Sequence, residues 1–211
     1  MKKLIYNCLF LGLLVTFFSS CEDKIMLSYY ETGEKYEEYQ YIADSVKHGI
    51  YRKYSQEGML LETANYVNGK LEGERIIYNF ISGVKEVSEI YRNDLLDGRY
   101  IVFHSNGEMQ SFGVYKNNVL SGTVRFYDTS GMLKNEFQFV NNFEIIPFQE
   151  FYENGNVKWE GTKRYDHFWG LKKDYGLLKE YNEDGELIRK IMCDESEICT
   201  TTWTIDGSHL K

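Results

Sequence analysis

Short runs of alternating apolar and polar residues recur along most of the chain, and glycines separate them. Residues 49–54 and 124–127 are examples, although neighbouring aromatic residues such as Phe126 and Tyr127 leave open which face is buried. Alternation with a period of two is typical of β-strands that bury one face. The pattern therefore predicts many short strands joined by tight turns.

These runs repeat at a fixed interval. An aromatic residue stands four or five positions before each glycine of the series, and successive glycines lie 24 or 25 residues apart. The series consists of Gly33, Gly58, Gly83, Gly107, Gly131 and Gly155, with Gly185 following after a longer interval of 30 residues. A fixed period of this length is typical of repeat arrays, in which each copy packs against its neighbours.

A second series of turn residues lies between the glycines. It consists of Asn68, Asn93, Asn117 and Asn141, each two positions after a Tyr or Phe. Asn-Gly and Asp-Gly pairs favour hairpin turns because both residues tolerate a positive φ. Two strands of about seven residues and two turns fill one period, and a single hairpin is marginally stable in water. We therefore expect an all-β fold, in which tandem antiparallel β-hairpins over residues 29–192 form an elongated twisted sheet and residues 193–211 form a C-terminal cap or tail.

Residues 66–73, which read Tyr-Val-Asn-Gly-Lys-Leu-Glu-Gly, resemble the MORN repeat. The resemblance is to the variant found in bacterial proteins of the YwqK antitoxin family, and it covers roughly residues 29–192. It implies β-hairpins in an elongated sheet that associates with proteins or membranes, and it suggests an antitoxin role. The sequence departs from the pattern beside Pro147, where Ile146 replaces a repeat glycine, and between Gly155 and Gly185.

Composition supports a single β domain with a tail and argues against nucleic-acid binding. The 211 residues include 18 Tyr, 13 Phe, 18 Gly and one Pro, which makes an all-helical fold improbable. The formal net charge is −8, and an acidic surface repels a phosphate backbone.

The first 20 residues have the features of a signal peptide. Lys2 and Lys3 precede an apolar run that is too short to span a bilayer, and Phe18-Ser19-Ser20-Cys21 resembles a bacterial lipobox. We expect cleavage before Cys21, acylation of that residue and a tether over residues 21–28. The alternative is an ordinary cleaved leader. Lipid anchoring would place the protein in the bacterial cell envelope, at the outer membrane, on its periplasmic face or on the cell surface. Glu22-Asp23-Lys24 is either a surface-export tag or a solvated linker.

The remaining candidate chemistry is sparse. Cys193 and Cys199 are candidates for a disulfide, with two free thiols as the alternative; no nearby His or third Cys supports a metal site. No nucleotide, zinc or nucleophile motif is present, so we expect no cofactor and no enzymatic activity.

A basic and aromatic insertion lengthens the sixth repeat unit. It is our candidate binding site, because Trp, Tyr and Arg are enriched where binding energy concentrates. The alternative is a loop that packs over the adjoining hairpin. The candidate residues are Arg164, Tyr165, Phe168, Trp169 and Lys172.

The sequence favours a membrane-anchored module that binds a protein partner or acts as a scaffold. One alternative is an antitoxin or immunity protein that neutralises a toxin. A less favoured alternative is an enzyme that acts on cell-wall glycans.

Overall fold

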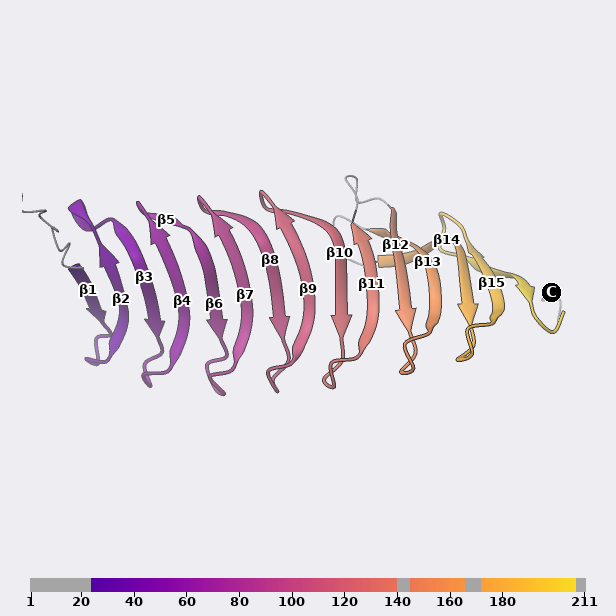
Figure 1. The fold of residues 1–211 in the computed structure, drawn as a ribbon, viewed down its shortest axis with the longest axis horizontal. Helices are drawn as coiled ribbons and strands as arrows, with labels where there is room; N and C mark the ends of the chain where they lie inside the picture. The colour runs from indigo at the N-terminus through magenta and orange to yellow at the C-terminus, as the bar shows by residue number, and fades with distance from the viewer. Residues whose placement is uncertain (1–23, 140–144, 166–171, 208–211) are drawn as a thin grey trace, which may run out of the picture.

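The computed structural model describes residues 24–139, 145–165 and 172–207, and its strands form one antiparallel sheet (Figure 1). The predicted all-β fold of tandem hairpins is confirmed. A single 3-10 turn, Ala43–Ser45, interrupts the strands of the described residues. The strands are β1 (Lys24–Tyr29), β2 (Lys35–Tyr41), β3 (Lys47–Tyr54), β4 (Leu60–Val67), β5 (Lys70–Leu71), β6 (Gly73–Tyr78), β7 (Lys85–Arg92), β8 (Leu95–Phe103), β9 (Met109–Lys116), β10 (Val119–Tyr127), β11 (Leu133–Phe139), β12 (Ile145–Phe151), β13 (Val157–Tyr165), β14 (Lys172–Tyr181), β15 (Leu187–Cys193) and β16 (Cys199–Thr204).

The sheet follows the order of the chain. Each strand pairs with the next, except that the short β5 pairs with β4 alone and β4 continues to β6. Among the described residues β1 and β16 have a neighbour on one side only, and they lie at opposite ends of the elongated sheet (Figure 1). The described part of the chain contains no helix with the length and apolar character needed to cross a membrane.

One class of turn follows the repeated aromatic residue. The register shifts at a β-bulge just before this residue, for example between Lys53 and Tyr54 and between Phe126 and Tyr127. In most of these turns the glycine N–H bonds to the carbonyl three residues earlier, whereas Gly83 bonds to Asn79, four residues earlier. The bulge explains why neighbouring aromatic residues obscured the alternation, because it interrupts the period of two.

The other class of turn carries the asparagines. Asn93 and Asp94 have φ values of 49° and 66°, and Asn117 and Asn118 have 48° and 65°. Positive φ at both central residues is the geometry of a type I′ hairpin turn, whose twist matches that of the strands. The glycine that follows in the strand is also constrained, since a Cβ on Gly98 would lie 2.6 Å from the Cβ of Ile90.

The hydrophobic core lies in the C-terminal part of the sheet. It contains Val124, Phe137, Phe139, Ile146, Phe148, Leu178 and Cys193. Ile146, which replaces a repeat glycine, is only 1% exposed and is the most buried of these residues. The departure from the repeat pattern therefore adds apolar volume to the core.

One expectation about the ends of the repeat region changes. Strand β1 begins at Lys24, so most of the expected tether over residues 21–28 is part of the sheet, where it pairs with β2. Within residues 193–211, Cys199–Thr204 forms β16 and pairs with β15. The lengthened sixth unit also keeps its pairing, since Tyr165 pairs with Lys172 across the insertion.

Candidate binding surface

The predicted binding residues lie around the connection between β13 and β14. Arg164 is exposed near the end of β13, and its guanidinium carbon lies 5.4 Å from the ring centre of Tyr175. The backbones of Tyr165 and Lys172 pair across the hairpin. Phe168 and Trp169 lie outside the described residues, so their role as contacts remains a prediction.

Ion pairs hold the base of this insertion. The Lys163 ammonium lies 2.6 Å from an Asp174 carboxylate oxygen and 4.4 Å from the centre of the Phe148 ring. Lys173 pairs with Glu197, in the turn between β15 and β16. Two of the basic residues at the insertion are thus neutralised within the chain, whereas Arg164 presents its charge at the surface.

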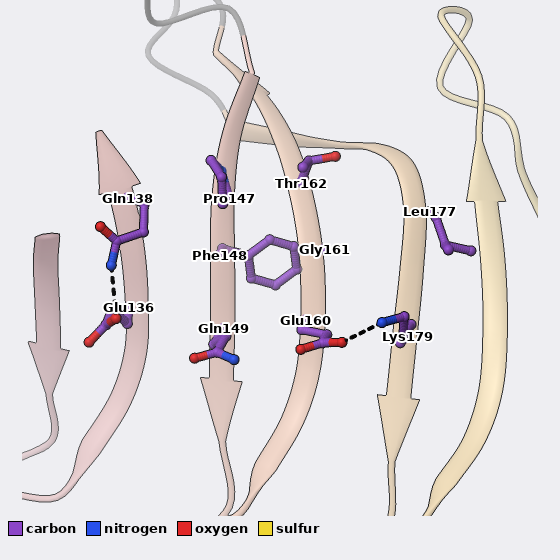
Figure 2. Close-up of a pocket in the computed structure, with 10 residues that line it drawn as sticks. All are labelled: Glu136, Gln138, Pro147, Phe148, Gln149, Glu160, Gly161, Thr162, Leu177 and Lys179. Atoms are coloured by element: carbon purple, nitrogen blue, oxygen red, sulfur yellow. Dashed lines mark hydrogen bonds and ion pairs between the residues drawn. The ribbon is translucent and has the colours of Figure 1, made fainter. Parts of the chain in front are cut away.

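A groove crosses strands β11–β14 near the insertion (Figure 2). It encloses about 400 Å³, and two rows of side chains border it. Residues directly opposite each other on paired strands share one face of a sheet, as do residues two positions apart on one strand. The first row, Glu136, Gln149, Glu160 and Lys179, is joined by cross-strand pairing; the second, Gln138, Pro147, Thr162 and Leu177, lies two positions along each of these strands. We call the face that carries these rows the front face, and the opposite face, which carries the rings of Phe137 and Phe148, the rear face.

Hydrogen bonds hold the polar side chains of the groove in place. Arg125 Nε donates to Glu136 at 2.8 Å, and Gln138 donates to the other oxygen of the same carboxylate at 3.0 Å. On the other side, Lys179 Nζ and the Tyr181 hydroxyl both donate to Glu160 Oε1 at 2.7 Å. Because these groups are tied to the sheet, the groove presents a pre-formed polar surface.

Hydrogen bonds keep one carboxylate of the groove charged. Hydrogen bonds from Lys179 and then from Tyr181 lower the pKa of Glu160 below its ordinary value. The carboxylate is therefore ionised at neutral pH and accepts hydrogen bonds. A general acid needs the opposite shift, a raised pKa that keeps its proton available.

A cluster on the rear face surrounds Lys47 in the N-terminal part of the sheet. The ammonium lies 4.1 Å from the ring centre of Tyr51, 4.8 Å from that of Tyr39 and 5.3 Å from that of Tyr66. Burial raises the pKa of the Tyr51 and Tyr66 hydroxyls, so both stay neutral. The chain's own lysine occupies this aromatic cage, which makes it a packing device.

The structure joins Cys193 and Cys199 in a disulfide across the β15–β16 hairpin. Within the described residues no group of three or more His, Cys, Asp or Glu side chains has a metal-binding arrangement. His104 acts in a turn, where its Nε2 lies 2.9 Å from the Tyr127 carbonyl oxygen of the next unit.

Sequence reasoning missed the polar row of the groove. Its signal lies in one column of the repeat, two positions before the turn aromatic: Arg52, Ile76, Ile101, Arg125, Gln149 and Lys179. Read along the array, this column is apolar in two central units and polar in the later ones. Aligning the repeat copies by their glycines would have shown that this column changes from apolar to polar along the array.

Comparison with known protein families gives one match. A model described as a MORN repeat variant matches residues 47–68 and 120–141. The first segment covers β3 and β4 with their turn, and the second begins in β10 and includes β11. No curated protein matches the chain. The chain therefore carries recognisable MORN-variant repeats at two places, and repeats of this type are generally associated with binding or scaffold roles.

Proposed function

We propose that the protein is an acylated lipoprotein of the bacterial envelope that binds a protein partner without covalent chemistry. The front-face groove and the exposed Arg164 form the contact surface, and Cys21 carries the lipid anchor. The observation that carries this proposal is the groove itself. It is open, its polar side chains are held by neighbouring strands, and it adjoins an insertion that the sequence marks by its basic and aromatic residues.

The chemistry of the surface favours a folded protein or an extended peptide as partner. Gln149, Thr162 and Lys179 offer donors and acceptors along the groove, and Pro147 and Leu177 add apolar contact. A mixed surface of this kind resembles the polar and apolar composition of non-obligate interfaces. The acidic net charge makes nucleic acid an unfavourable partner.

In vivo photocrosslinking tests the proposal. A photoreactive amino acid is placed at Gln149 or Lys179 in the groove, and at Glu180 on the opposite face as the matched control. We expect one protein to be captured from the groove positions and not from the control, and the purified partner to bind the wild-type chain. Equal capture from both faces would contradict the proposed surface.

Substitution of Arg164 separates binding from folding. Because the guanidinium is exposed, Arg164→Ala should change stability by less than about 0.5 kcal/mol. We expect it to weaken capture of the partner several-fold, since Arg is frequent among residues that dominate binding. An immunity role is one specific form of this function, and capture of an envelope-directed toxin would identify it.

A further inference from the structure

Both ends of the sheet carry exposed apolar side chains, which are Ile198, Trp203 and Ile205 at the β16 end and a row on the edge strand β1. Strand β1 exposes a row of backbone groups together with three large side chains: Ile25 is 61% exposed, Leu27 43% and Tyr29 58%. Ile25 pairs with Gln40 and Leu27 with Glu38, so both project from the front face. Exposed apolar residues on an edge strand are typical of a surface that another protein or a membrane covers.

The short segment between Cys21 and β1 indicates that the covering surface is a membrane. Only Glu22 and Asp23 separate Cys21 from Lys24, the first residue of the strand. Three residue steps extend to at most about 11 Å. The headgroup region of one leaflet is roughly 5–8 Å thick. If Cys21 carries the acyl chains, as the proposed function holds, β1 is confined to the membrane surface.

The distribution of charge agrees with this placement. Residues 24–54, which form the first three strands, contain five Lys or Arg and five Asp or Glu. Residues 55–211 contain 17 Lys or Arg and 25 Asp or Glu. An anionic leaflet repels the acidic remainder and tolerates the neutral end.

We infer that the β1 edge is a membrane-docking surface, on which Ile25, Leu27 and Tyr29 rest in the headgroup region of the bilayer that holds the acyl chains. This inference rests on the acylation of Cys21. It also sets the position of the groove, since β1 and β12 lie at well-separated places along the sheet (Figure 1). Ten strand spacings of about 4.8 Å place the groove roughly 50 Å along the sheet from the docked edge.

Fluorescence quenching by lipids tests the docking. The full chain is produced in a bacterium that acylates lipoproteins, and it is reconstituted in liposomes of phosphatidylcholine and phosphatidylglycerol. A Leu27→Cys variant carries an NBD fluorophore, and Ile205→Cys, at a residue 59% exposed beyond β16, is the matched control. Phosphatidylcholine with a doxyl group near the headgroup should quench the probe at position 27 about two-fold or more and leave position 205 unchanged.

The possible outcomes distinguish this inference from the proposed function. Mass spectrometry of the N-terminal peptide and flotation with liposomes report acylation, and their failure would overturn both. Acylated, liposome-bound protein with equal quenching at the two positions would overturn the docking alone. A probe at position 27 that is shielded from water but not quenched by doxyl lipid would also overturn it, because a second protein would then cover the edge.

Discussion

The N-terminal and C-terminal parts of the sheet fill the same face with different chemistry. One continuous cross-strand row on the rear face includes Tyr51, Arg75 and Glu89 in the N-terminal part and Phe137 and Phe148 in the C-terminal part. Along this row, ion pairs and tyrosines fill the first part, whereas an apolar cluster fills the second. The turns of the repeat therefore specify the backbone geometry, whereas the side chains that stabilise each unit differ along the sheet.

The largest expected effect lies in the C-terminal part. Ile146→Ala removes a side chain that is 1% exposed, and we expect it to lower the free energy of unfolding by about 3 kcal/mol. Ile50→Ala, at a residue 46% exposed, is the control and should cost less than about 0.5 kcal/mol. Urea titration measures both values.

Hydrogen exchange tests whether that loss is local. In a repeat array each unit contacts only its neighbours, so exchange in Ile146→Ala should accelerate first in β11–β15. Uniform acceleration from β2 to β15 would contradict the distinction between the two parts.

The second prediction concerns the ion pairs of the N-terminal part. Arg75 Nε lies 2.8 Å from Glu62, and its Nη1 lies 3.0 Å from Glu89, which is 8% exposed. Arg75→Met leaves these two carboxylates without their common cation, and we expect a loss of about 2–3 kcal/mol at pH 7. Thermal unfolding of the variant measures the loss.

A triple variant controls for the shape of the side chain. Arg75→Met combined with Glu62→Gln and Glu89→Gln removes the like charges and should recover most of the lost stability. If the triple variant is as unstable as Arg75→Met, packing of the arginine stem outweighs charge at this position.

The sequence was sufficient for the overall fold because the information is local. Gly107 and Asn117 each mark a turn whose φ values few residues adopt. The even spacing of the glycine and asparagine series to which they belong indicates the number of hairpins. The start of the sheet was less predictable, since Lys24–Tyr29 has no repeat glycine before it and becomes a strand only by pairing with β2. The groove was missed because Glu136, Gln149 and Glu160 are adjacent only across strands, a relation that the linear sequence does not display.

The third prediction concerns the disulfide at the C-terminal edge. Cys193 and Cys199 close a short loop, and loop-closure entropy assigns such a bond roughly 2 kcal/mol. Cys199→Ser should therefore lower stability by about this amount, and it should increase hydrogen exchange in β16 more than in β1. Cys193→Ser is expected to cost more, because Cys193 is 2% exposed in the core. Equal exchange in β16 with and without the bond would contradict this role.

The smallest expected effect is the pH dependence that Glu38 contributes in the N-terminal part. Lys35 and Arg52, at 2.8 Å and 2.7 Å from its oxygens, lower the pKa of Glu38 to about 2. A carboxyl whose pKa is lower in the folded state stabilises the fold above its ordinary pKa, near 4.5 here, and this stabilisation is lost as the pH falls toward 2. Both cationic partners are substantially exposed, so we expect a contribution below about 1 kcal/mol. Glu38→Gln should therefore reduce the difference in stability between pH 7 and pH 3, measured by urea titration. Ile146→Ala removes no titratable group and should leave that difference unchanged, and a similar change in both variants would show that Glu38 is not its source.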